Sequence, residues 1–361
     1  MRVLLVAEQL RRRVPGGIGT YVRGLLMGLS QLEAAAGPDH RAEVTLWASR
    51  GGRPDPLAGL GPSLVTSRLP GPALTRAWDL GLCPAPSGFS AVHAPSLAAP
   101  PTRSVPLVVT VHDLAWRRLP DAFPGRGLRW HEAALARVLA RARLFVVPSR
   151  AVADALVGAG APTDRVEVVE EGSDHLPPPD EAAADVLLRG LGVRGHYLLA
   201  VGTLEPRKNL ERLLAAYAGA RPRLPERWPL VVVGPRGWGA DVAPGEGVLL
   251  AGPVDSAVLS ALYRGARCLA YVPLLEGFGL PAVEAMAAGT PVVASPMPST
   301  GAAALEVDPT DVDGMAAALV TAATDETARG ELVAAGRERA SSLSWRDAAR
   351  RHVEVWNEAV R

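Results

Sequence analysis

Short runs of valine and leucine alternate along the whole chain with longer stretches rich in alanine, leucine and arginine. Such apolar runs are typical of strands buried on both faces of a parallel sheet, and the stretches between them have helical length. The alternation predicts repeated strand–helix–strand units. Units of this kind wind into α/β sheets whose ligands bind beyond the carboxyl ends of the strands.

The first part of the chain holds seven predicted strands and three predicted helices. The strands are expected at Val3–Ala7, Val44–Ala48, Leu64–Ser67, Ala91–His93, Leu107–Val111, Leu144–Val147 and Val166–Val169. The helices are expected at Gly19–Leu32, Gly127–Arg141 and Ala151–Gly158, the last of them capped by Ser149.

The pattern stops at Gly172–Asp180, where three consecutive prolines form a stiff, extended linker. A chain of 361 residues exceeds the size of one comfortable core, so we place a domain boundary after residue 172.

Beyond the linker the alternation begins again. Strands are expected at His196–Val201, Leu230–Gly234, Val248–Leu250, Cys268–Val272, Pro291–Ala294 and Ala304–Val307. Helices are expected at Asn209–Ala220, Ser256–Gly265, Pro281–Ala288, Val312–Ala322, Glu326–Leu343 and Trp345–Val360. The fold class is therefore α/β, with two doubly wound domains.

Composition excludes several classes of protein. With 48% apolar and 21% charged residues the chain reads as globular, and no apolar run is long enough to span a membrane. Two distant cysteines give no disulfide framework, which fits a reducing cytoplasm. The first half is net basic and the second net acidic. A basic half suits an anionic acceptor or the inner membrane face, or the asymmetry is incidental; we expect no nucleic-acid partner.

Lys208 is the only lysine, and every other basic residue is arginine. A coding bias that strong leaves lysine where its compact charge is needed, for instance on a phosphate or in a Schiff base. Lys208 lies in Gly202-Thr-Leu-Glu-Pro-Arg-Lys-Asn209, between a predicted strand and a predicted helix. Such loops bind phosphates in α/β proteins. The alternative is a surface lysine that drift has spared.

A second segment, Glu276-Gly-Phe-Gly-Leu-Pro-Ala-Val-Glu284, also follows a strand and opens a helix. Gly277 and Gly279 allow close approach of a ligand to the backbone, and Pro281 suits the first helical turn. A helix start favours an anion such as a diphosphate. Glu276 could accept hydroxyl protons from a sugar, and Glu284 could bind the two hydroxyls of a ribose.

Three further sequence features could suggest a metal or dinucleotide site, and each favours another interpretation. Asp311-Val-Asp313 resembles a metal motif, but its place before a helix favours capping. The histidines lack zinc-ligand spacing, so no metal site is predicted. Pro15–Gly19 lacks the spacing of a dinucleotide fingerprint, and we interpret it as a flexible loop that opens a helix.

Together these motifs resemble those of retaining glycosyltransferases of family 4, which have the GT-B fold. The two second-half segments are that family's most specific motifs. The first half adds Pro15-Gly-Gly-Ile-Gly19, Val111-His-Asp113 and Val147-Pro-Ser149. The Gly202–Asn209 string is similar to that of bacterial mannosyltransferases of surface-polysaccharide synthesis.

The resemblance implies two Rossmann-like domains facing each other across a cleft, with the last helix crossing back to the first domain. It assigns residues 1–172 and 345–361 to an acceptor-side domain, and residues 173–344 to a donor-binding domain. By the same resemblance the catalytic residues are His112, Arg207, Lys208 and Glu276. The implied donor-binding residues are Gly17, Gly19, Gly202, Gly277, Phe278, Gly279, Leu280 and Glu284.

The implied reaction moves a hexose, best mannose from GDP-mannose, to a glycan, lipid-linked or small-molecule acceptor with an α-glycosidic bond. Arg207 and Lys208 would meet the charge that grows on the diphosphate, so no metal or other cofactor is expected. The protein is expected in the cytoplasm, free or peripheral at its membrane. The alternatives are a non-catalytic nucleotide-sugar-binding protein and a pyridoxal-phosphate phosphorylase with Lys208 as its lysine.

The sequence departs from the family pattern at one place. After Ser295–Thr300, family members usually continue through a loop containing Pro-Glu, whereas here Thr300 runs directly into Gly301-Ala-Ala-Ala. Donor contacts from Ser295–Thr300 are therefore left open.

Overall fold

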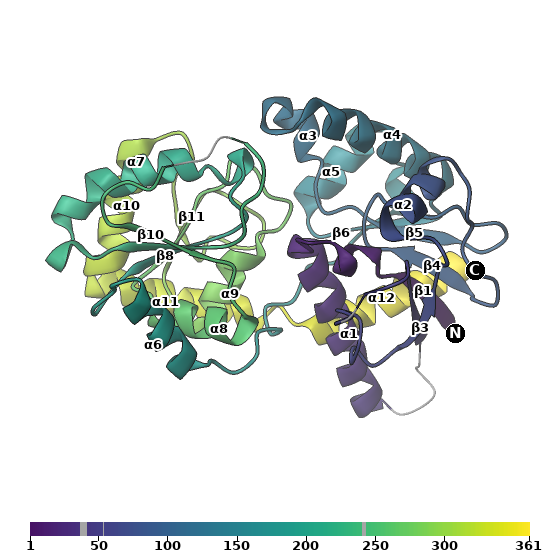
Figure 1. Ribbon diagram of the computed structural model, residues 1–361, viewed down its shortest axis with the longest axis horizontal. Coiled ribbons are helices and arrows are strands. Elements are labelled where there is room, and N and C mark those ends of the chain that lie inside the picture. The colour runs from purple at the N-terminus through teal and green to yellow at the C-terminus, as the bar shows by residue number, and fades with distance from the viewer. Residues whose placement is uncertain (37–41, 53, 240–242) are drawn as a thin grey trace. The chain divides into compact units, whose positions relative to one another are not determined.

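A computed structural model describes residues 1–36, 42–52, 54–239 and 243–361 (Figure 1). The chain forms two compact units. The first comprises Met1–Gly172 together with Ser344–Arg361, and the second comprises Ser173–Leu343. The last helix thus belongs to the unit in which the chain begins.

The first unit is built on a seven-stranded parallel sheet in the order β3-β2-β1-β4-β5-β6-β7. Its strands are β1 (Arg2–Val6), β2 (Glu43–Ala48), β3 (Ser63–Thr66), β4 (Ala91–Ala94), β5 (Leu107–Thr110), β6 (Leu144–Val147) and β7 (Val166–Val168).

Its helices cover both faces of the sheet (Figure 1). They are α1 (Gly16–Ala36), α2 (Gly71–Asp79), α3 (Ala115–Arg118), α4 (Gly125–Arg141), α5 (Arg150–Gly158) and α12 (Trp345–Val360). α12, yellow in Figure 1, lies along the purple α1 and also packs on β4 and β5. As predicted, the Ser149 side chain accepts the Val152 amide and caps α5.

The second unit has a six-stranded parallel sheet in the order β10-β9-β8-β11-β12-β13. Its strands are β8 (Leu198–Val201), β9 (Leu230–Val233), β10 (Val248–Gly252), β11 (Leu269–Tyr271), β12 (Val292–Ala294) and β13 (Leu305–Glu306). The chain winds outward from β8 to β10 and then returns to the other side of β8 at β11. The topological switch point therefore lies between β8 and β11.

Helices α7 (Leu210–Ala220) and α10 (Val312–Thr324) pack together on one face of this sheet. The other face is covered by α6 (Glu181–Gly190), α8 (Ser256–Gly265), α9 (Leu280–Ala288) and α11 (Glu326–Ser341) (Figure 1). The central strands β8, β9, β11 and β12 are buried on both sides, as the apolar runs predicted, whereas the edge strands β10 and β13 are partly exposed.

Several local predictions were incomplete or wrong. The helices α2, α3 and α6 were not predicted, and the segment Pro15–Gly19, predicted as a flexible loop, runs into the first turn of a helix. α1 begins at Gly16, so the glycines form its first turn. Pro15 lies directly before this turn, and the Gly19 amide donates to its carbonyl oxygen, which closes the first turn earlier than the apolar pattern indicated.

In the part of the chain that the structure describes, no helix is both long and apolar enough to cross a lipid bilayer. Cys83 and Cys268 are both free thiols, as their separation in the sequence predicted.

Candidate active site

Two loops converge at the switch point of the second sheet. One follows β8 and carries Arg207 and Lys208 in a short 3₁₀ turn, Pro206–Lys208. The other follows β11 and carries Glu276. Because β8 and β11 are neighbouring parallel strands, residues far apart in sequence meet at their carboxyl ends.

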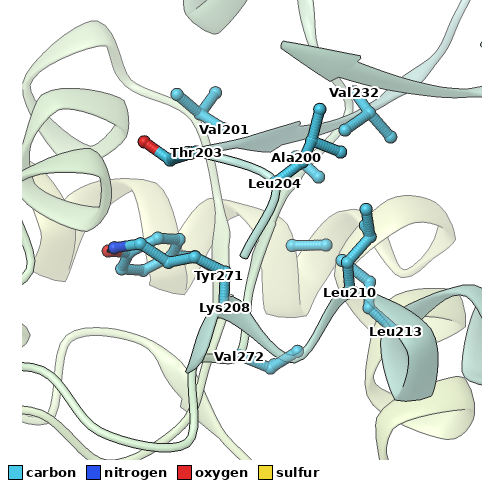
Figure 2. A pocket seen from close by; sticks show the side chains of 12 residues that line it. Ala200, Val201, Thr203, Leu204, Lys208, Leu210, Leu213, Val232, Tyr271 and Val272 are labelled. Carbon is cyan, nitrogen blue, oxygen red and sulfur yellow. The ribbon is translucent and has the colours of Figure 1, made fainter. Parts of the chain in front are cut away.

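Lys208 lies at the centre of this arrangement. Its ammonium donates to Glu276 Oε1 at 2.5 Å and to the Tyr271 hydroxyl at 3.0 Å. In Figure 2 the Lys208 side chain lies beside the Tyr271 ring, over which its ammonium is placed. Its methylene stem runs beside Gly202, where an added Cβ would meet lysine carbons at 3.6–3.7 Å. The lysine is thus held by packing along its length and by hydrogen bonds at its tip.

Arg207 contributes a second cation to the same carboxylate. Its Nη1 lies 3.1 Å from Glu276 Oε1 and donates to the Leu275 carbonyl at 3.1 Å. Its Nε and Nη2 donate to Glu205 Oε1 at 3.2 and 3.0 Å. Arg207 therefore bridges two carboxylates, with only 14% of its side chain exposed.

The electrostatics of the two carboxylates differ. Burial acts to raise the pKa of Glu276, but the charges of Arg207 and Lys208 and hydrogen bonds from Lys208 and Tyr271 outweigh it and hold the pKa at about 2. The pKa of Glu205 is raised instead, because its burial outweighs the nearby Arg207. Glu276 is therefore an anion across the neutral range.

Asn209 fixes the loop behind the two cations. It has a left-handed backbone, φ 60°, which asparagine tolerates better than most residues. Its buried amide donates to the carbonyls of Val272 at 3.0 Å and Pro309 at 2.7 Å. The side chain therefore ties the loop after β8 to the end of β11.

The predicted anion-binding segment Gly277–Leu280 leads into α9. Gly279 has φ 108°, and an added Cβ would meet Met297 Sδ at 2.4 Å, so this position requires glycine. The side chains of Phe278 and Leu280 are buried. This segment therefore presents backbone groups at a helix start to a ligand. At the other end, α9 stops where the sequence predicted, because Gly289 follows it with a left-handed backbone, φ 78°.

Glu284 lies in the middle of α9 and is 6% exposed. Its Oε1 is 2.8 Å from His175 Nε2, and its Oε2 accepts the Tyr263 hydroxyl at 2.7 Å. Sequence reasoning predicted the glutamate but neither of its partners.

The remaining predicted residues lie in the first unit. His112 follows β5, with Nδ1 3.2 Å from Glu171 Oε1 and Nε2 3.1 Å from the Pro95 carbonyl. Both partners offer oxygen atoms as hydrogen-bond acceptors. Gly17 and Gly19 lie in the first turn of α1. A Cβ at Gly17 would meet nothing within 4 Å, whereas one at Gly19 would meet Pro15 Cβ at 2.5 Å.

Sequence reasoning missed several partners of the predicted residues. They are Glu171, His175, Glu205, Tyr263 and Tyr271. Glu205 alone had a local signal, since it stands two residues before Arg207 in the same motif.

A small cavity of about 30 Å³ lies behind Lys208 (Figure 2). It is lined mainly by apolar side chains of β8, β9, β11 and α7, among them Ala200 and Leu213, and by Val272, which follows β11. This apolar wall supports the lysine stem and is too small for a substrate.

Among the described residues, no group of three or more His, Cys, Asp or Glu side chains could hold a metal ion. Asp311, the first residue of the metal-like motif, accepts the Gly314 amide at 2.9 Å and caps α10. The capping interpretation of that motif is confirmed.

Two family models match most of the chain. One, described as glycosyl transferases group 1, matches residues 195–325, and one described as glycosyltransferase family 4 matches residues 15–175. A relative from Escherichia coli, O-antigen chain mannosyltransferase B, is 32% identical over 279 residues that cover 73% of each chain. The chain belongs to glycosyltransferase family 4. It is a hexosyltransferase.

A further relative extends the similarity along the glycosyltransferase. Phosphatidyl-myo-inositol mannosyltransferase of Mycolicibacterium smegmatis is 30% identical over 366 residues, covering 92% of this chain and 87% of that protein.

Solved structures confirm the GT-B fold class. Sucrose-phosphate synthase from Thermosynechococcus elongatus matches with a TM-score of 0.73 and 20% identity, over 99% of this chain and 98% of that one. Anabaena HepE in complex with UDP-glucose matches with a TM-score of 0.71 and 18% identity, over 99% and 100%.

Proposed function

We propose that this glycosyltransferase moves mannose from GDP-mannose to a glycan, lipid-linked or small-molecule acceptor, and that the new bond keeps the α configuration. The observation that carries the proposal is the Arg207–Lys208–Glu276 cluster at the switch point of the second sheet. Two cations and one acceptor carboxylate suit a ligand that joins a diphosphate to a sugar.

The chemistry follows from the bond that breaks. As the sugar leaves its diphosphate, negative charge grows on the phosphate oxygens. Arg207 and Lys208 are already held at this edge of the sheet before a donor binds, by the Leu275 carbonyl and the Tyr271 hydroxyl among others. Removal of one such preorganised group costs about 100–1,000-fold in rate.

In the ligand-free site Glu276 neutralises both cations. A diphosphate competes with it for Arg207 and Lys208, and the carboxylate then turns to the hydroxyls of the donor sugar. In the ligand-free site Arg207 and Lys208 hold the pKa of Glu276 at about 2, so the carboxylate is ionised when the donor arrives and can accept hydrogen bonds from those hydroxyls.

In this proposal the transfer needs no metal, because the two cations and the start of α9 meet the charge of the leaving group. His112 contacts the donor sugar, and the leaving phosphate itself activates the acceptor hydroxyl. The protein works in the cytoplasm or at the inner face of its membrane.

Mannose is favoured as the donor sugar by the names of two relatives, an O-antigen chain mannosyltransferase and a phosphatidyl-myo-inositol mannosyltransferase. Those names also favour a glycan or a lipid-linked molecule as acceptor. The UDP-glucose bound by HepE carries no weight for the donor, because 18% identity supports the fold alone.

The proposal is tested by calorimetric titration of the purified protein with GDP, UDP, ADP and dTDP in the presence of EDTA. We expect GDP to bind most tightly, and Lys208→Ala to weaken it by about tenfold or more. Arg189→Ala, a change on the exposed surface of α6, is the matched control and should bind like the wild type.

Transfer is then measured from GDP-mannose, and the anomeric configuration of the product is read by NMR. Absence of binding to all four nucleotides would refute the donor site, and tightest binding of another nucleotide would refute GDP-mannose. An inverted product would refute retention, and a requirement for added divalent metal would refute the metal-free mechanism.

A further inference from the structure

Glu284 is a buried carboxylate held by two side chains from outside its own helix. His175 Nε2 lies 2.8 Å from Oε1, and the Tyr263 hydroxyl on α8 lies 2.7 Å from Oε2. The exposed fractions are 8% for the Glu284 side chain and 11% for that of His175. Each carboxylate oxygen therefore has one fixed partner.

The direction of each hydrogen bond follows from the chemistry of the partners. Burial, and next the charge of Glu284, raise the pKa of Tyr263 well above its usual range, so the phenol stays protonated and donates. Nε2 of His175 also donates, because a carboxylate only accepts. A carboxylate has about four acceptor positions, so two hydrogen bonds leave capacity for two more.

The backbone around His175 is fixed on both sides. Ser173 donates from its backbone amide to the Leu343 carbonyl at 3.1 Å and from its hydroxyl to the Ala340 carbonyl at 2.8 Å. The Asp180 amide donates to the Ala257 carbonyl on α8 at 3.0 Å. Three prolines, Pro177–Pro179, stiffen the stretch between these anchors.

This fixation distinguishes His175 from a residue that happens to lie near a carboxylate. A rigid segment holds the imidazole against one oxygen while a buried tyrosine holds the other. The plane of the carboxylate is thereby set before a ligand arrives, which is how a site gains selectivity for a ligand with two hydroxyls.

We propose that His175 is a positioning residue that sets nucleoside specificity: with Tyr263 it orients Glu284 to accept hydrogen bonds from the 2′- and 3′-hydroxyls of the donor ribose. The inference rests on the proposed function, because it takes the second unit as the nucleotide-binding unit. His175 acts through Glu284 and contacts neither the sugar nor the diphosphate.

The test compares the binding of GDP and 2′-deoxy-GDP, measured by calorimetry, to the wild type and three variants. The wild type should bind GDP about tenfold more tightly than 2′-deoxy-GDP, because one hydrogen bond to a charged group contributes about that factor. His175→Ala should lower the affinity for GDP by about tenfold and leave the affinity for 2′-deoxy-GDP nearly unchanged, so that the preference disappears. Tyr263→Phe should act in the same direction.

His175→Gln is the rescue variant, because its amide nitrogen can donate from a position close to that of Nε2. It should restore most of the preference for GDP. If His175 had a merely structural role, His175→Ala would lower the affinity for both nucleotides equally. The glutamine variant would then not restore the preference for GDP selectively. Circular dichroism and melting temperatures show that each variant is folded.

The outcomes separate this inference from the proposed function. If the wild type binds GDP but does not distinguish it from 2′-deoxy-GDP, the role of His175 is refuted and the donor site stands. If His175→Ala lowers the affinity for both nucleotides by the same factor, the role of His175 is again refuted. If the wild type binds neither nucleotide, the proposed donor fails and the inference fails with it.

Discussion

Lys208 is held along its stem and at its tip, so the position of its ammonium group is fixed as well as its charge. Its stem packs beside Gly202, and its ammonium contacts Tyr271 and Glu276. A guanidinium is wider and planar, and it cannot occupy the same point between a phenol and a carboxylate.

We therefore expect Lys208→Arg to lower kcat by about tenfold or more even though it keeps the charge, because the cation is displaced from the leaving group. Lys208→Ala should lower kcat by about 100–1,000-fold. The measurement is the transfer of labelled mannose from GDP-mannose, with Arg189→Ala as the unaffected control. Wild-type kcat in Lys208→Arg would mean that charge alone matters at this position.

Single residues also show the limit of motif reading. Arg207, Lys208 and Glu276 could be singled out because each stands in a recognisable local string. His175 and Tyr271 have no such string, and their contacts with Glu284 and Lys208 span 109 and 63 residues. No local pattern encodes a contact between such distant positions.

The first and the last helix of the chain pack closely against each other. On α1, a Cβ at Gly24 would meet the Trp345 ring at 2.1 Å, and one at Gly28 would meet the Trp345 backbone oxygen at 2.0 Å. Glycine at these two positions, four residues apart on one face, lets α12 approach the backbone of α1.

Gly28→Ala should therefore destabilise the protein by about 1–3 kcal/mol, because the added methyl group meets backbone that cannot rotate away. Gly330→Ala is the control: this glycine lies inside α11 and an added Cβ would meet nothing within 4 Å. It should gain up to about 1 kcal/mol from helix propensity. Urea unfolding followed by circular dichroism measures both, and an unchanged midpoint for Gly28→Ala would contradict the packing argument.

The accuracy of each predicted helix depends on how clear its local sequence pattern is. α12 was predicted with its observed bounds because its apolar face repeats clearly, whereas α1 extends further at both ends than the pattern indicated. α2 was missed because Gly71 and Pro72 at its start are typical of a turn, although proline also suits a first helical turn. Where local signals conflict, the packing of the helix on the sheet decides.

At the scale of the whole molecule, a buried hydrogen-bond chain joins residues from both ends of the sequence. The His352 Nδ1 donates to the Ala348 carbonyl, so its Nε2 accepts the Tyr21 hydroxyl at 2.6 Å. Tyr21 in turn meets Thr110 Oγ1 at 2.8 Å, and Thr110 meets His93 Nε2 at 2.8 Å. This orientation requires His352 to be neutral, and it leaves Nε2 of His93 to donate to Thr110.

Burial lowers the pKa of His352 to about 4, and it lowers that of His93 well below its usual value. The unfolded chain, with histidine pKa values near 6.5, then binds more protons than the folded chain. The stabilisation is full above about pH 6.5 and is lost as the pH falls toward 4.

Between pH 7 and pH 5 we expect a loss of about 2 kcal/mol from His352, and a further loss in the same direction from His93. The measurement is the urea midpoint of unfolding across this range. His352→Gln keeps an acceptor for Tyr21 but cannot titrate in this range, and its stability should depend less steeply on pH. An equally steep dependence in this variant would show that other groups are responsible.

The sequence by itself determined the features that depend on residues close together in the chain. The alternation of apolar runs and helical stretches determined two α/β domains, the proline segment marked the boundary between them, and two strings supplied Arg207, Lys208 and Glu276. These features depend on residues that are neighbours in the chain, where hydrophobic periodicity and loop chemistry act directly.

Only the tertiary structure decided which groups surround the predicted ones. It supplied Glu205 and Tyr271 to the cations, His175 and Tyr263 to Glu284, and the Gly28 contact to α12. Hydrogen bonds and packing act over a few ångströms in space, whatever the separation in sequence. A carboxylate therefore gains a fixed orientation and a shifted pKa only after the sheet has brought its partners to the same edge.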